Sequence, residues 1–223
     1  MQFHFENIPP LTDEERVILW HSQLDETEET EGSVVAGLYI SDNRSRRRRA
    51  TRWLQVQAIK APFYREGGWL IPGGMEASWL YEESCFSYVS GAYLAALLCA
   101  HASCERVLAG CLISYEERLP KGWSMWGLGK LAPKAHELGL IDEPMRVQLH
   151  HLGDLRKVSA HFKPPLEPNS VASRALRQVV NDRDIENEDE FDALLRTDAL
   201  MAIKITTELL HGDEGFARVR YWG

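Results

Sequence analysis

Several features that mark other classes of protein are missing from this chain of 223 residues. No basic segment followed by an apolar one opens the sequence, so we expect no secretion signal. The longest apolar stretch, Tyr88 to Ala102, is shorter than the roughly 20 residues that a membrane-spanning helix needs. These absences predict a cytoplasmic protein that does not use a membrane as a partner.

Cysteine is scarce and is not arranged for binding a metal. The sequence contains Cys85, Cys99, Cys104 and Cys111, which are scattered along predicted helices without a C-x-x-C pair. We therefore expect small core residues rather than a zinc site or a disulfide framework. The sequence offers no other cluster of metal ligands, and it predicts no metal and no other cofactor.

Positive charge is concentrated in one place only. The net charge is -8, which is the wrong sign for a protein that coats nucleic acid over its whole surface. The exception is an arginine-rich segment that consists of Arg44, Arg46, Arg47, Arg48 and Arg49, with Arg52 nearby. Two interpretations are open: the segment binds an RNA backbone, or it is a solvated loop that balances the acidic run before it.

The chain divides near residue 75 into two unlike parts. Residues 1–75 predict an irregular α/β extension with a capped helix from Asp13 to Leu24. Two β-like runs, Val34–Ile40 and Trp53–Ile59, predict a hairpin with the arginine-rich segment as its loop.

Residues 76–223 show the helical period instead. The expected helices cover residues 77–89, 91–117, 130–138, 142–161, 170–180 and 189–210. Gly139 is the expected C-terminal cap of one helix, and Asp142 is the expected N-terminal cap of the next. The connections are short, so this part predicts a mainly α fold, an up-and-down helical bundle.

An arginine precedes a histidine by five positions more than once, so this spacing alone is not specific. The matching pairs are Arg16/His21, Arg146/His151 and Arg156/His161. The helix over residues 142–161 carries an apolar stripe made of Met145, Leu149, Leu152 and Leu155. At about 100° per residue, Arg156 falls on that stripe, whereas Arg146 and His151 fall outside it. A guanidinium inside apolar surface is costly unless it is paired, so Arg156 should have a partner or a function.

The long helix over residues 91–117 shows a similar anomaly. His101 and Glu105 lie one turn apart on its apolar side. They can pair with each other and with an arginine from a facing helix, and we expect Glu105 to meet Arg156. Such a cluster is either part of an active site or an ion pair that fixes the packing of the helices, and His101 by itself fits a satisfied core histidine.

The order of these features resembles the HEPN domains over about Trp79 to Leu210, and is most similar to uncharacterised bacterial members. The resemblance rests on Ala100–Arg106, Gly127–Leu131, Gly139–Asp142, Leu155–His161 and Asp198–Ile203. It implies a helical bundle that cuts RNA without a metal. His161 would handle the proton of the ribose 2′-hydroxyl or the leaving oxygen, and Arg156 would stabilise charge on the phosphate. The products would be a cyclic phosphate and a 5′-hydroxyl end.

The resemblance also implies a homodimer. On a continuous helix, Arg156 and His161 are roughly 7.5 Å apart along the axis and about 140° apart around it, which suits one phosphate poorly. The HEPN solution is a two-fold dimer with both pairs in one cleft. We expect His101 and Glu105 to join this catalytic group, and Lys157 and the arginine-rich segment to contact RNA.

Two kinds of biological role follow from this resemblance. One is an endoribonuclease in a toxin or antiphage system, with an antitoxin or another defence protein as its partner. The other is a non-catalytic HEPN scaffold that binds a partner protein, a nucleotide or a nucleic acid. Lys157 favours the second, because a small polar residue usually follows the arginine in HEPN proteins.

Overall fold

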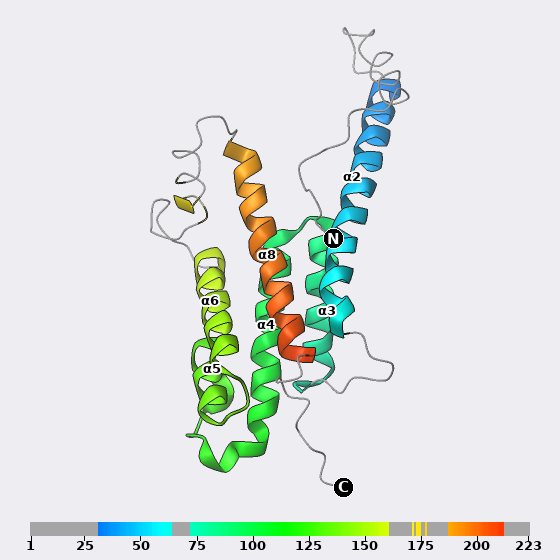
Figure 1. The fold of residues 1–223 in the computed structure, drawn as a ribbon. Coiled ribbons are helices and arrows are strands. Elements are labelled where there is room, and N and C mark those ends of the chain that lie inside the picture. The colour runs from blue at the N-terminus through cyan, green and yellow to red at the C-terminus, as the bar shows by residue number, and fades with distance from the viewer. Residues whose placement is uncertain are drawn as a thin grey trace. The chain divides into compact units, whose positions relative to one another are not determined.

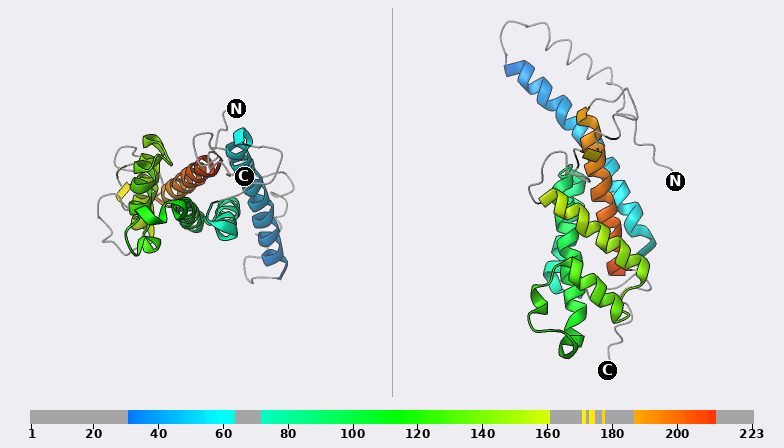
Figure 2. Two further views of the ribbon diagram at one scale, coloured as in Figure 1. Left: turned by 90° about the horizontal axis from the view of Figure 1, so that it is seen from below. Right: turned by 90° about the vertical axis from the view of Figure 1, so that its left-hand side faces the viewer.

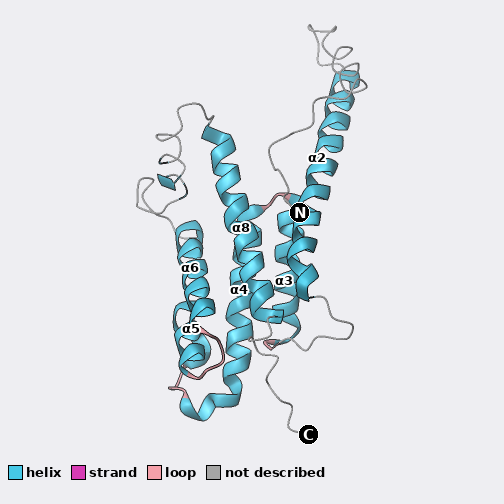
Figure 3. Cartoon of the chain, in the orientation of Figure 1, coloured by secondary structure: helices cyan, strands magenta, loops and turns pink. Residues whose placement is uncertain are grey.

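The computed structural model describes residues 31–63, 72–160 and 187–211, together with residues 171, 173, 174 and 177. Its α-helices are α2 (Glu31–Lys60), α3 (Gly74–Ser90), α4 (Tyr93–Leu112), α5 (Leu128–Glu137), α6 (Glu143–Ala160) and α8 (Asn187–His211). Short 3-10 turns cover Ala61–Phe63, Ile113–Arg118 and Trp123–Met125. Within these ranges the regular structure is entirely helical (Figure 3), which confirms the predicted mainly α fold. The helix predicted over Asp13 to Leu24 and most of the one over residues 170–180 lie outside the described residues.

The predicted hairpin is wrong, because a single helix, α2, occupies both β-like runs and the arginine-rich segment. The run Trp53–Ile59 alternates in hydropathy like a strand, but its burial follows a helical period. Gln55 and Val56 are buried, and Ile59 is half-buried one turn later. No proline or glycine interrupts the arginine-rich segment, so nothing in it stops a helix.

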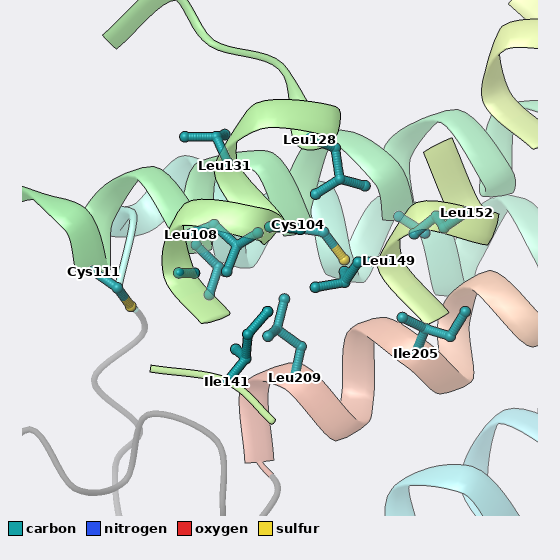
Figure 4. Packing of buried hydrophobic residues seen from close by; sticks show 14 of the residues in the cluster. Cys104, Leu108, Cys111, Leu128, Leu131, Ile141, Leu149, Leu152, Ile205 and Leu209 are labelled. Carbon is teal, nitrogen blue, oxygen red and sulfur yellow. The ribbon is translucent and has the colours of Figure 1, made fainter. Parts of the chain in front are cut away.

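The chain forms two compact units, Met1–Thr51 and Arg52–Gly223. In the second unit α4 is the central helix, and it packs against α3, α8, α5 and α6 (Figure 1). The main core surrounds α4 and is drawn in Figure 4. Its buried members include Cys104, Leu108, Leu131, Leu149, Leu152 and Leu209. This core therefore joins the helical segments that the sequence predicts for the bundle.

The cysteines lie where small core residues are expected. Cys85, Cys104 and Cys111 are buried, Cys99 is half-buried, and all four are free. Burial raises the pKa of the Cys104 thiol to about 12, and the Thr206 hydroxyl beside it lowers that value only in part. The Cys104 side chain is therefore a neutral packing group at physiological pH.

The helix ends follow the chemistry of their caps. Asp142 caps α6, because its carboxylate accepts a hydrogen bond of 2.8 Å from the backbone N–H of Met145. Gly139, with a φ of 69°, closes the turn after α5, where the Leu140 N–H donates to the Ala135 carbonyl at 2.8 Å. Both caps confirm the boundaries expected from the sequence.

Two glycines allow the start of α3 to contact the backbone of α4 near its C-terminal end. A Cβ atom added to Gly110 would lie 2.2 Å from the backbone nitrogen of Gly73, and one added to Gly73 would lie 2.5 Å from the Arg106 carbonyl oxygen. Gly73 also has a φ of 93°, which side chains rarely adopt. This backbone-to-backbone contact requires glycine on both sides.

One helical stretch in the described ranges, Tyr93–Arg118, is long and apolar enough to cross a membrane by length and composition. Of its most apolar window, 56% is buried inside the protein. The core position of α4 accounts for much of this apolar character, so the described helices are compatible with a soluble protein.

Candidate functional site

The apolar stripe of α6 faces the core as predicted, and Arg156 sits at its edge. Leu149, Leu152 and Leu155 are buried, and Arg156 is half-buried. On the same helix His151 is exposed, whereas Arg146 is half-buried like Arg156 and is bound to Glu143 in the preceding turn. The exposed position of His151 agrees with the helical projection, but burial does not distinguish Arg146 from Arg156.

His101 lies on the α4 surface that faces the core, with only 6% of the residue exposed. Its Nδ1 atom is 3.8 Å from Oε2 of Glu105. Burial lowers the pKa of His101, the carboxylate of Glu105 opposes that shift, and the guanidinium of Arg156 adds to it. The pKa of the imidazole therefore lies below its ordinary value of about 6.5, and the ring is neutral at pH 7.

Glu105 bridges two helices rather than pointing freely to solvent. Its Oε1 atom accepts a hydrogen bond of 2.8 Å from the backbone N–H of Leu128, the first residue of α5. The N-cap residue of that helix, Gly127, has no side chain that could satisfy this N–H. Glu105 therefore caps α5 from α4, and its negative charge lies at the positive end of the α5 dipole.

Arg156 brings α6 to this cluster. Helices α4 and α6 pack together, and the positive charge of Arg156 lowers the pKa of His101, so the two residues lie within electrostatic range of each other. Three of the four predicted catalytic residues thus belong to one region of the bundle. The fourth, His161, lies outside the described residues.

The predicted RNA-binding residues lie on two different helices, α6 and α2. Lys157 is exposed on α6 and pairs with Asp154, its Nζ atom lying 3.2 Å from the carboxylate. The arginine-rich segment is helical, so the four successive residues from Arg46 to Arg49 point in directions about 100° apart and spread around α2. They therefore do not form a single flat basic face.

Arg52 has a structural role in the second unit. Its Nε donates to the Val89 carbonyl at 2.8 Å and its Nη1 donates to the Tyr93 hydroxyl at 3.2 Å. The guanidinium also stacks 5.8 Å from the centre of the Tyr93 ring. Arg52 is therefore committed to joining α2 to α3 and α4 within that unit.

The sequence did not point to one ion pair that the structure shows. Arg174 forms a bidentate pair with Asp198, which is 4% exposed on α8, and the Nη1–Oδ1 distance is 3.0 Å. The sequence feature that could have indicated this ion pair is Asp198 itself, a carboxylate directly before the apolar residues Ala199 to Ile203. Ala199 and Ala202 are buried in the structure. A buried carboxylate of this kind requires a cation.

A comparison of the chain with protein-family models, with curated proteins and with solved structures finds no match.

Proposed function

We propose that this protein is a metal-independent endoribonuclease of the HEPN type that acts as a cytoplasmic homodimer. The observation that carries the proposal is the pair of the buried His101 and Glu105 on α4, which lies within electrostatic range of Arg156 on α6. In this account Arg156 stabilises the charge that develops on the scissile phosphate. His161, five residues along the chain, moves the proton of the ribose 2′-hydroxyl.

The burial of His101 favours a positioning role for this residue. A group that exchanges protons with a polymeric substrate must reach it, and His101 is almost fully enclosed. With Glu105, it fixes the surroundings of Arg156, so its replacement should alter the reaction through the placement of the arginine. Both residues stay within the proposed site, but neither is expected to contact RNA.

The second pair on α6 provides a matched control for the experiment. Arg156→Ala and His161→Ala should each abolish cleavage of a mixed-sequence RNA by the full chain, whereas Arg146→Ala and His151→Ala should leave it unchanged. All four variants remove the same residue types at the same spacing, and circular dichroism checks that each is folded. Equal activity in all four would refute the assignment to Arg156 and His161.

A non-catalytic scaffold is the second candidate, and one contact favours it. The Oε1 atom of Glu105 is already bound to the N–H of Leu128, which is a purely structural use of the carboxylate. In that case the cluster would only hold α4, α5 and α6 together. The purified dimer would cleave no RNA and would instead retain a partner such as an antitoxin or another defence protein.

A further inference from the structure

One side of the α3–α4 pair has no helical cover in the second unit. Seen along the helix axes, α8 lies on one side of α3 and α4, and none of the described helices of the unit lies on the opposite side (Figure 2). The residues of α4 on that side form what we call the open face. They are Ala95, Leu98, Cys99, Ala102, Arg106 and Ala109, continued by Ile113.

A ridge of large apolar side chains on α3 borders the open face. Met75, Trp79 and Phe86 are spaced four and seven residues apart, which places them along one side of the helix. Their exposed fractions are 64%, 61% and 69%, and that of Ile113 at the end of α4 is 62%. An exposed apolar surface of this extent, bordered by charged residues, is typical of an interaction site.

The middle of the open face carries small residues at a spacing that suits packing against another helix. Ala95, Ala102 and Ala109 follow one another at intervals of seven, the repeat of helices that pack in a left-handed coil. The small side chains allow a second helix to approach closely. Since α4 already packs against four other helices on its remaining sides, this repeat is left for a partner outside the described part of the chain.

The charges on this surface complement each other when two copies meet. We propose that the open face and the α3 ridge form the interface of a two-fold homodimer, with α4 antiparallel to its copy and crossing it at Ala102. In such a pair, Arg106 of one subunit lies opposite Cys99 of the other. Glu83 is exposed on α3, the helix that packs against α4, and it lies close enough to Cys99 for its charge to add to the effect of burial in raising the pKa of that thiol.

Because of the two-fold symmetry, the contact between Arg106 of one subunit and Glu83 of the other occurs twice in the dimer. The same arginine would be costly against lipid, which argues against a membrane as the occupant. Within one subunit the Arg106 guanidinium lies 3.4 Å from Glu76, and both side chains remain about half exposed. Arg106 can thus serve as a bridge between an acidic residue of its own subunit and one of the copy.

This interface rests on the proposed function, in which the protein is a homodimer, and adds the surface through which the two subunits contact each other. Glu105 is less than one turn from Ala102, so the crossing would also bring the two His101–Glu105–Arg156 clusters to the same edge of the interface. The inference about the interface is nevertheless tested without RNA.

The first test is the mass of the full chain in solution. Sedimentation velocity at micromolar concentration should give twice the 25.4 kDa of one chain. Ala102→Glu places two carboxylates at the axis and should weaken the dimer by roughly 100-fold or more. Val147→Glu, the same charge on an exposed apolar site of α6, should leave the mass unchanged. A monomeric wild type, or an Ala102→Glu variant that stays dimeric, would overturn the proposal.

The second test shows whether the charge pair forms between subunits. Arg106→Glu and Glu83→Arg should each be folded monomers, because like charges would then face each other twice. In an equimolar mixture both contacts become attractive, and heterodimers should form. A mixture that stays monomeric would contradict the pairing, as would liposome binding by a monomeric wild type. A dimer that behaves as predicted but cuts no RNA would refute the nuclease alone. An active monomer would refute the interface and the dimeric form of the enzyme, but not the RNA cleavage itself.

Discussion

Replacing Glu105 by alanine should destabilise the protein through the N-terminus of α5. The substitution removes the acceptor for the Leu128 N–H, which costs about 1 kcal/mol for a typical N-cap. It also removes a negative charge from the positive end of the helix, worth about 0.5 kcal/mol. The neutral His101 lies 3.8 Å from the carboxylate and adds little. The free energy of unfolding should fall by about 1.5 kcal/mol, and Tm by roughly 3–6 °C.

Three further variants make this prediction specific. Glu105→Gln keeps an oxygen that accepts the hydrogen bond and should lower the free energy of unfolding by only about 0.5 kcal/mol. Gly127 has an extended backbone, with φ of -85° and ψ of 174°, which suits a serine N-cap. Adding Gly127→Ser to the alanine variant should therefore restore about 0.3 kcal/mol, since glycine is itself tolerated at an N-cap. In the wild type, where the new Cβ would lie 3.1 Å from Oε1 of Glu105, the serine should bring no such gain.

Urea denaturation followed by circular dichroism measures the stability of the wild type and of all four variants. Equal stability of the alanine and glutamine variants would show that the hydrogen bond contributes nothing, which would refute the proposed cap. The same conclusion would follow if serine at position 127 stabilised the wild type and the alanine variant to the same extent, because Glu105 would then not be the cap.

Substitutions at three more positions test other parts of the structure. Gly110→Ala should lower the free energy of unfolding in urea by about 2 kcal/mol, since its Cβ would meet the backbone of Gly73; an unchanged midpoint would contradict the close contact. Asp198→Ala should cost about 3 kcal/mol in the same assay by leaving Arg174 without its carboxylate, and Asp198→Asn should cost less. Because the pKa of His101 is lower in the folded state, its contribution to stability is complete above about pH 6.5 and is lost as the pH falls below that value, by up to about 1.4 kcal/mol per unit. Denaturation curves of His101→Gln should show a weaker dependence between pH 7 and 5, and an identical dependence would exclude this histidine as the cause.

The bundle was predictable because its helices carry local signals. The stripe of Leu149, Leu152 and Leu155, the cap at Asp142 and the positive φ at Gly139 are each encoded within a few residues. Such signals survive folding because packing and capping reinforce the local preference. The position of Arg156 at the edge of the stripe followed from the same helical projection.

The wrong prediction of a β-hairpin in the N-terminal part and the missed long-range contacts have different physical causes. The run Trp53–Ile59 fits both a strand and a helix, and its packing against Tyr88 decided the outcome: the Tyr88 hydroxyl donates to Gln55 at 2.6 Å. The cap formed by Glu105 joins residues 23 positions apart, and Arg174 meets Asp198 across 24 positions. No local pattern encodes such partners, because only the packed helices bring them together.

The most direct test of the proposed nuclease is the chemistry of the RNA ends that it produces. The purified chain should generate fragments with a cyclic phosphate and a 5′-hydroxyl, in the presence of a chelator as well as without it, and Arg156→Ala should generate none. Fragments with 3′-hydroxyl ends, activity that disappears with the chelator, or RNA left intact by the wild type would contradict the proposal.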